Sequence, residues 1–146
     1  DFNIDKRLDL FAATPPLEFL RYLVSRCASS QMNARKTKLM VQDVKKAYFY
    51  AAATRRIYVA LPAEDIRPGE EAMCGMLERS LYGTRDATYN WTETYTMVLC
   101  EVLGFEKGAS SPCTFFHKKR QLRIVVHGDD FFTEDVNKIC RFFILR

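Results

Sequence analysis

The chain has 146 residues, a length that fits one domain with a buried core. Its 48% hydrophobic and 27% charged residues exclude a disordered chain, and a net charge of +4 permits a polyanionic partner without requiring one. The longest apolar run, residues 48–53, is too short to span a membrane, and no signal peptide pattern opens the chain. We therefore expect an intracellular globular protein, cytoplasmic or nuclear, with no membrane partner. Because the ends carry no terminal signatures, we also expect a piece of a longer protein.

The cysteines indicate a reducing compartment. They are spaced irregularly and form no Cys-x-x-Cys motif: Cys27, Cys74, Cys100, Cys113 and Cys140. Their odd number argues against a disulfide scaffold, and with only two histidines a zinc site is not expected. We predict reduced thiols, most of them buried.

The first predicted element is an amphipathic helix over residues 16–29. Thr14 is a typical N-cap, and Pro15 is a typical first helical residue. The polar, basic residues 30–38 that follow are typical of a loop. Apolar residues at helical spacing indicate one buried face, made of Leu17, Leu20, Val24 and Cys27.

A predicted strand over residues 39–43 ends in a carboxylate. Alternation places Leu39, Val41 and Asp43 on one face, so that an acid closes an otherwise apolar row. An acid at this position is costly unless it is exposed or bound to something. Residues 44–50 then predict a tight turn or a short helical piece.

Two further strands, residues 57–61 and 73–78, are expected to pair as a hairpin. Pro62 stops the first strand, and residues 63–71 form an acidic loop with a turn at Pro68-Gly69.

The strongest helical pattern covers residues 87–103, and Gly104 is well placed as its C-cap. The apolar residues at helical spacing are Trp91, Tyr95, Val98, Leu99, Val102 and Leu103. We expect this face to be buried, which favours a core role for its aromatic residues over nucleic-acid stacking.

Two strands, residues 113–117 and 123–127, follow a polar loop at residues 107–111. The turn between them is basic, which is typical of a solvated hairpin tip or of a primer or template contact: Lys118, Lys119 and Arg120. The second strand runs into a very tight turn with Asp129 and Asp130 at its tip.

Phe131-Phe132 is expected to complete this short hairpin. Thr133-Glu134 is then expected to cap a last helix that runs through Ile139 and Phe143.

The aspartates are the candidate metal ligands of the chain. Adjacent carboxylates between apolar strands repel each other, and a divalent cation is an obvious compensating charge. An aspartate pair in a turn is also typical of a plain solvated turn. If the strand that ends at Asp43 lies beside the hairpin of Asp129 and Asp130, the three carboxylates suit two Mg²⁺ ions about 3.5–4 Å apart.

Five segments of the chain resemble blocks of copia-type retrotransposon reverse transcriptases, in the same order and at the same spacing. With a weaker match that precedes them, they cover roughly residues 10–132. The segments and the family patterns are residues 42–48 (D-V-K-x-A-F), 57–62 (v-Y-m-x-q-P), 74–91 (C-r-L-x-x-S-L-Y-G-L-k-Q-A-p-r-x-W), 103–105 with 111–113 (L-G-F … D-P-C) and 127–130 (Y-v-D-D).

The resemblance implies an α+β fold: a reverse-transcriptase palm, in which helices back an antiparallel sheet that carries the aspartates, with part of the fingers. Residues 1–146 would form a partial reverse transcriptase domain without the thumb, ribonuclease H and integrase regions. The implied activity is RNA-directed DNA polymerisation, in which a primer 3′-hydroxyl attacks the α-phosphate of a deoxynucleotide. The implied partners are an RNA or DNA template–primer, dNTP and the rest of a Pol polyprotein.

The resemblance also implies roles for single residues. Asp43, Asp129 and Asp130 would be catalytic and would bind two Mg²⁺ ions, with Mn²⁺ as a possible substitute and the backbone carbonyl of Val44 as a further ligand. The residues expected around the nucleotide are Tyr48 as the gate against a 2′-hydroxyl, Gly83 under the templating pair, and Lys45, Lys46 and Arg85 as phosphate contacts. A plain core aromatic remains the alternative for Tyr48.

The chain departs from the family at three positions. Asp86 replaces a glutamine and Thr88 a proline, and an acid near the nucleotide is expected to weaken template or triphosphate binding. His127 replaces a tyrosine, and it is either a strand residue beside the site or a metal ligand or general acid.

Two other functions remain open. One is a non-catalytic remnant that keeps the shape of the palm and at most binds nucleic acid, although the three intact aspartates favour the enzyme lineage. The other is a different palm-type enzyme, such as a nucleotide cyclase, against which Leu81-Tyr82-Gly83 and Trp91 count.

Overall fold

The computed structural model of this protein describes residues 13–30, 37–70 and 72–135. They form two compact units, the first from residues 46–94 and the second from residues 13–45 and 95–135. Residues 31–36 of the loop expected at residues 30–38 lie outside the described residues, as do Cys140 and the part of the expected last helix that contains Ile139 and Phe143.

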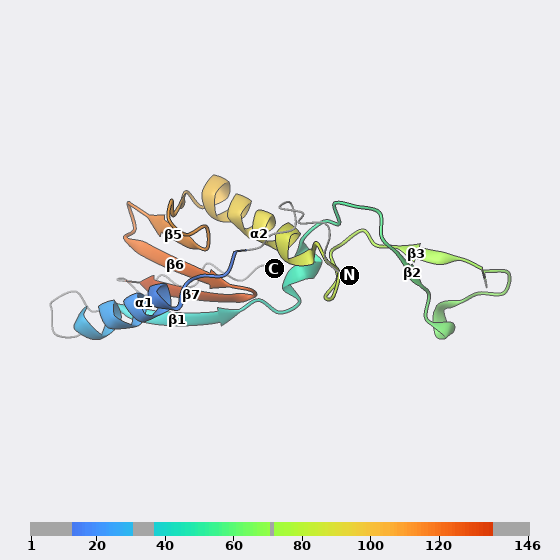
Figure 1. Ribbon diagram of the computed structural model, residues 1–146, viewed down its shortest axis with the longest axis horizontal. Helices are drawn as coiled ribbons and strands as arrows, with labels where there is room; N and C mark the ends of the chain where they lie inside the picture. The colour runs from blue at the N-terminus through green and yellow to red at the C-terminus, as the bar shows by residue number, and fades with distance from the viewer. Residues whose placement is uncertain (1–12, 31–36, 71, 136–146) are drawn as a thin grey trace, which may run out of the picture. The chain divides into compact units, whose positions relative to one another are not determined.

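A five-stranded antiparallel sheet forms the second unit, with strand order β1-β7-β6-β5-β4 (Figure 1). Its strands are β1 (Lys38–Asp43), β4 (Glu106–Lys107), β5 (Thr114–His117), β6 (Leu122–His127) and β7 (Asp130–Asp135). The predicted strands that correspond to β1, β5 and β6 are confirmed, whereas β4 is an unpredicted two-residue strand that overlaps the predicted loop only at Lys107. The order of the strands places β1, from early in the chain, beside β7.

One face of this sheet packs around Tyr95. Phe115 lies directly opposite Ile124, and Val126 lies opposite Phe131, so these apolar side chains share a face. The Tyr95 ring meets the rings of Phe115 and Phe131 edge-on, with centroids 6.0 and 5.7 Å apart. Such edge-to-face pairs add to the burial of the rings, and this cluster is the core of the unit.

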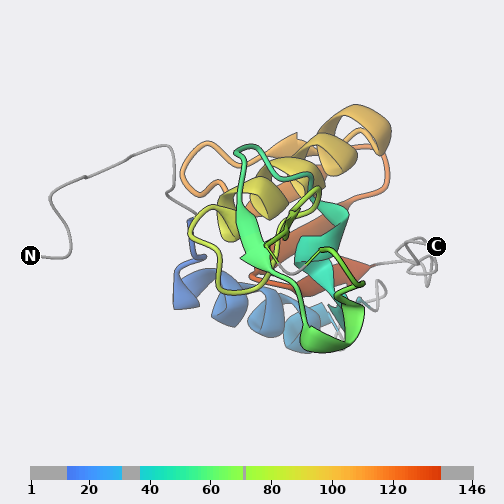
Figure 2. The same ribbon diagram turned by 90° about the vertical axis from the view of Figure 1, so that its right-hand side faces the viewer.

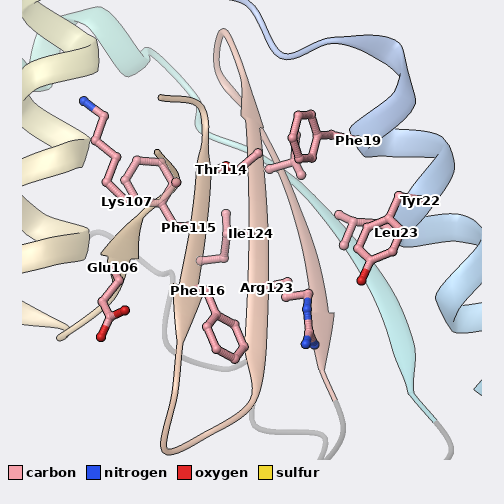
Figure 3. Close-up of a pocket in the computed structure, with 12 residues that line it drawn as sticks. Phe19, Tyr22, Leu23, Glu106, Lys107, Thr114, Phe115, Phe116, Arg123 and Ile124 are labelled. Carbon is pink, nitrogen blue, oxygen red and sulfur yellow. The ribbon is translucent and has the colours of Figure 1, made fainter. Parts of the chain in front are cut away.

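Helix α1 (Leu17–Ser30) lies where it was predicted, but its buried face is different. Leu23 and Cys27 are buried, whereas Leu17 and Val24 are exposed, so the prediction for these two residues is wrong. The helix is turned so that Leu23 faces the strands, as Figure 3 shows. A cavity of about 290 Å³ lies between this helix and strands β4, β5 and β6.

The second helix changes its geometry near its end. Helix α2 (Ala87–Met97) continues as a π-helical turn, η4 (Val98–Val102), in which the amide of Leu103 donates to the carbonyl of Val98. Gly104 ends the helix with a φ of 75°, as expected of a C-cap. Val102 is exposed, contrary to the prediction, because the wider turn moves it off the face that buries Leu99.

Strand β7 corrects the expectation of a helix cap at Thr133-Glu134. Both residues continue the strand, opposite Ile124 and Arg123 of β6, and both are buried. The sequence pattern was misleading because a threonine followed by an acid is typical of a helix start, whereas here the acid has cationic partners inside the unit.

The first unit contains the predicted hairpin of β2 (Tyr58–Ala60) and β3 (Cys74–Met76) (Figure 1 and Figure 2). Two 3₁₀ helices accompany it, η2 (Ala47–Tyr50) and η3 (Ala63–Asp65). The expected short helical piece before the hairpin is therefore confirmed. Trp91, in the part of α2 that belongs to this unit, is buried, as predicted.

Each described cysteine carries a thiol rather than a disulfide. Cys27 and Cys113 are buried, which raises the pKa of both thiols, while Cys100 is half-buried and Cys74 is exposed. No helix among the described residues is long and apolar enough to cross a membrane.

Candidate active site

Asp43 and Asp130 lie directly opposite each other, at the ends of β1 and β7. His127 lies opposite Asp130 on the other side, across the β6–β7 hairpin. Directly opposed residues of antiparallel strands point to the same face, so Asp43, Asp130 and His127 form one row across three strands. The predicted proximity of the first strand and the aspartate hairpin is therefore present in the second unit.

The hairpin tip is joined to the end of β1 through Asp129. Only Gly128 and Asp129 separate β6 from β7, and Gly128 has a φ of 66° while Asp129 has no positive φ, the pattern of a type II′ turn. The amide of Val44 donates a hydrogen bond to the carbonyl oxygen of Asp129 at 3.0 Å. This bond uses the amide of Val44 and leaves its carbonyl oxygen as the atom that could serve as a ligand.

Asp43 and Asp130 carry like charges at directly opposed positions, and Asp129 adjoins Asp130 in the chain. Asp43 is exposed, whereas Asp129 and Asp130 are half-buried. Within the described part of the chain, no cationic side chain forms an ion pair with any of the three. Like charges directly opposite each other in a sheet are destabilising, so this edge of the sheet favours a bound cation.

The donor set fits a hard divalent cation, but its side chains do not form a closed cage. Carboxylate and carbonyl oxygens are the ligands that Mg²⁺ prefers. Among the described residues, however, no three side chains of histidine, cysteine or acidic residues are arranged to hold a metal ion. Asp43 and Asp130 are therefore paired across the two strands, with Asp129 in the adjoining turn, while the described side chains do not form a metal site.

The residues predicted to contact the nucleotide belong to the first unit, except for Lys45. Tyr48 lies in η2, half-buried, with its ring centroid 4.3 Å from that of Tyr82. Gly83 has a φ of 87°, a conformation that favours glycine, and Arg85 is exposed. Lys45 is exposed at the end of the second unit. It stays a prediction that these residues lie around the carboxylates of Asp43, Asp129 and Asp130.

Lys46, another basic residue assigned to a phosphate, is the N-cap of η2. It is exposed and adopts a left-handed conformation with a φ of 59°. This conformation is uncommon for a residue with a side chain and fixes the entry of the chain into the 3₁₀ helix.

Asp86, one of the departures from the family, is buried in a polar network of the first unit. Arg55 Nε lies 3.1 Å from its Oδ1 as an ion pair. The Thr54 hydroxyl donates to Asn90 Oδ1 at 3.0 Å and lies 3.5 Å from Asp86 Oδ2, and Asn90 in turn donates to Ser80 Oγ at 3.0 Å. The carboxylate is therefore neutralised within its own unit, which gives Asp86 a structural role.

An ion-pair cluster around a buried acid in the second unit was not predicted from the sequence. Glu134 accepts from Arg26 Nε at 3.0 Å, and Arg123 Nη1 lies 3.5 Å from the same carboxylate oxygen. The hydrogen bond to Glu134 raises the pKa of the Arg26 guanidinium. One feature of the sequence could have indicated it: Glu134 follows the aromatic pair of β7 in a run that is typical of a continuing strand.

The family model described as "Reverse transcriptase (RNA-dependent DNA polymerase)" matches residues 3–142 of the chain. This match covers nearly the whole sequence, including both units and all of the predicted site residues.

Among curated proteins, the chain is similar to Gag-Pol polyproteins of Saccharomyces cerevisiae (strain ATCC 204508 / S288c). It is 31% identical over 97 residues to the "Truncated transposon Ty1-A Gag-Pol polyprotein", covering 65% of this chain and 8% of that protein. The "Transposon Ty1-DR5 Gag-Pol polyprotein" and the "Transposon Ty1-LR2 Gag-Pol polyprotein" match at the same identity and length, over 5% of each.

The matched region thus spans less than a tenth of the length of these relatives. No solved structure matches the chain. The family match and the Ty1 relatives confirm the predicted resemblance to copia-type elements: the chain belongs to the reverse transcriptase (RNA-dependent DNA polymerase) family.

Proposed function

We propose that the chain is the palm, with part of the fingers, of a copia-type reverse transcriptase that catalyses RNA-directed DNA polymerisation. In this reaction the 3′-hydroxyl of a primer attacks the α-phosphate of a dNTP, and pyrophosphate leaves. The family match and the similarity to Ty1 polyproteins support the reaction class. The partners under this proposal are an RNA or DNA template–primer, dNTP and the other regions of a Pol polyprotein.

In this proposal, Asp43, Asp129, Asp130 and the carbonyl of Val44 bind two Mg²⁺ ions, or Mn²⁺ in their place. Bound divalent cations supply a Lewis acid that lowers the pKa of the attacking hydroxyl and neutralises charge on the leaving group. The chain contributes the positions of the ligands. The pairing of β1 with β7, in which Asp43 lies opposite Asp130, and the backbone hydrogen bond from the Val44 amide to the Asp129 carbonyl support this assignment of ligands.

The remaining site residues bind and orient the nucleotide in this proposal. Tyr48 acts as the gate against a 2′-hydroxyl, a role that requires a rigid ring, and its contact with Tyr82 supports that rigidity. The absence of a side chain at Gly83 lets the backbone approach the templating pair closely. Lys45, Lys46 and Arg85 are exposed cations that suit phosphate contacts.

The direct pairing of Asp43 with Asp130 is the observation that supports the proposal most strongly. The test measures primer extension by the Pol protein that contains this chain and compares it with extension by the Asp129→Asn variant. Loss of several kcal/mol of electrostatic stabilisation is expected to lower the rate by roughly 10³-fold. The matched control is Asp65→Asn, which makes the same change at an exposed acid of the hairpin loop and should leave the rate unchanged. Extension that survives Asp129→Asn would exclude this site.

A non-catalytic, nucleic-acid-binding remnant is the second candidate. The observation that favours it is the lack, among the described residues, of three side chains arranged to hold a metal ion. This candidate predicts binding of a template–primer with no extension in either Mg²⁺ or Mn²⁺.

A further inference from the structure

The β2–β3 hairpin of the first unit presents an exposed apolar face. Tyr58 lies directly opposite Met76, and Ala60 lies opposite Cys74, so these four side chains point to the same side. All four residues are exposed, and Tyr58 and Met76 retain 58% and 54% of their accessible surface. A contiguous apolar patch of this kind is typical of an interaction site.

The other face of the hairpin is less exposed, because its own side chains cover part of it. Val59 lies opposite Gly75, and both are half-buried. A Cβ added to Gly75 would lie 3.2 Å from Leu61 Cδ2 and 3.6 Å from Val59 Cγ2, so these side chains cover the glycine closely. A two-stranded hairpin with three residues in each strand is marginally stable without further packing. The face of Tyr58 and Met76 is therefore the side where a partner would add stability.

Charge is distributed unequally along the hairpin. The connecting loop has one basic residue, Arg67, and three described acidic residues, Glu64, Asp65 and Glu70. The opposite end, where the strands continue toward η2 and α2, has one acidic residue, Glu78, and three basic residues, Arg55, Arg56 and Arg79. Even with Arg55 paired to Asp86, the loop end is net negative and the opposite end is net positive.

We propose that the Tyr58–Met76 face is a self-association surface and that its occupant is the same face of a second copy of this chain. With the two hairpins antiparallel, the acidic loop of each copy lies against the arginines of the other, and the apolar side chains meet at the centre. A parallel arrangement would place like charges together. The antiparallel pair is an isologous, two-fold interface, which closes at a dimer. This inference concerns the hairpin alone and is independent of polymerase activity.

The dimer is expected to be weak. The patch is much smaller than the roughly 20–30 residues that each partner contributes to a standard stable interface. Association should therefore depend on protein concentration, and sedimentation equilibrium of the whole chain measures it. A chain that stays monomeric at the highest soluble concentration would overturn the proposal.

The first variant places a charge at the centre of the face. Met76→Glu should weaken dimerisation by at least tenfold, because the new carboxylate would be desolvated between the two hairpins. The matched control is Met97→Glu, which changes a methionine with a similar exposed fraction, 48%, on α2. An equal effect of the two substitutions would contradict the assignment of the interface to this face.

A charge exchange tests the antiparallel arrangement. Asp65→Arg and Arg56→Glu should each weaken self-association several-fold, because each places like charges together at both ends of the homodimer. An equimolar mixture of the two variants should associate about as well as the unmodified chain, since every pair across that heterodimer is again of opposite sign. A mixture that associates no better than the separate variants would refute the antiparallel pairing.

Alkylation of Cys74 tests the proposal without any substitution. The exposed thiol should react more slowly as the protein concentration rises through the association range, because the second copy covers it. A rate that does not depend on concentration would overturn the proposal. Protection of Cys74 by a template–primer oligonucleotide, at concentrations where the chain is monomeric, would overturn it in favour of nucleic acid as the occupant.

Discussion

The Val44 amide donates a hydrogen bond to the Asp129 carbonyl at 3.0 Å and so joins the end of β1 to the tip of the β6–β7 hairpin. One residue before Val44, Asp43 lies opposite Asp130. The backbone of one strand end thus sets the separation of the carboxylates that are proposed to bind metal. Changes in the turn should therefore alter both stability and ligand positions.

Gly128→Ala tests this dependence on the turn. Gly128 has a φ of 66°, so a Cβ should cost roughly 1–2 kcal/mol of unfolding free energy through backbone strain alone. Apart from its chain neighbours, no heavy atom of the described residues lies within 4 Å of the position that the Cβ would take, so these residues do not crowd it. Denaturant unfolding measures the loss, and an unchanged midpoint would show that this turn does not require glycine.

Asp43→Asn should stabilise the chain in the presence of EDTA. The substitution removes one of two like charges that are directly opposed across β1 and β7, which is worth about 0.2–1 kcal/mol. With Mg²⁺ in excess the variant should instead be less stable than the original chain, because it loses a ligand and with it the stabilisation that the bound ion provides. Thermal unfolding of both proteins, with and without Mg²⁺, measures these differences in stability. A variant less stable than the original chain in EDTA would contradict the repulsion.

Glu134→Gln should be strongly destabilising. The carboxylate is fully buried between Arg26 and Arg123, and removing it leaves two guanidinium groups without their charged partner. Breaking a buried pair costs about 3–5 kcal/mol, and the partial exposure of both arginines places the expected loss at the lower end.

The matched control for Glu134 is Glu106→Gln. Glu106 pairs with Lys118 at 2.8 Å, but both side chains are largely exposed, so the loss should be about 0–1 kcal/mol. Equal losses from the two substitutions in denaturant unfolding would show that Glu134 is not a buried anchor of α1.

Asp86→Asn tests whether this departure from the family weakens nucleotide binding or supports the fold. Because Asp86 is buried, pairs with the exposed Arg55 and accepts from Asn90, the substitution should lower the unfolding free energy by about 1–3 kcal/mol. Nucleotide affinity, measured by equilibrium binding, should not rise. A gain in affinity at unchanged stability would show that the acid acts on the ligand.

The buried thiols predict a loss of stability at alkaline pH. Burial raises the pKa of Cys27 and of Cys113 in the folded state, so folding favours the protonated forms. Their contribution is fully present below the ordinary thiol pKa of about 8.5, and it is lost as the pH rises through the folded-state values. Unfolding under reducing conditions should show this decline, with a smaller slope in the Cys27→Ala, Cys113→Ala variant. An unchanged slope would contradict the assignment to these thiols.

The sequence indicated most elements of the fold because their patterns are local. Helical spacing located both helices, and β-branched and aromatic runs located most of the strands. The exposed sides of α1 and η4 were mispredicted because Leu17, Val24 and Val102 fit the same apolar spacing as the buried residues. Only the packing of α1 on the sheet and the π-helical turn of η4 decide which residues are covered.

The candidate site depended on information that no local pattern contains. Asp43 and Asp130 are far apart in the sequence, and the register that opposes them follows from the pairing of β1 with β7. The resemblance to copia-type reverse transcriptases anticipated that pairing, whereas periodicity alone could not. The partners of Glu134 were missed for the same reason, since Arg26 and Arg123 approach it from other elements.

Binding of Mn²⁺ to the chain, followed by electron paramagnetic resonance, tests the central claim most directly. If Asp43 and Asp129 share a divalent cation, Asp43→Asn and Asp129→Asn should each weaken Mn²⁺ binding by at least about tenfold, the order of effect expected when a site loses an ionic ligand. Asp65→Asn, with the same change of charge on the hairpin loop, should leave the affinity unaltered. Mn²⁺ binding that is equally strong in all three variants would contradict the claim that the ends of β1 and of the β6–β7 hairpin form one metal site.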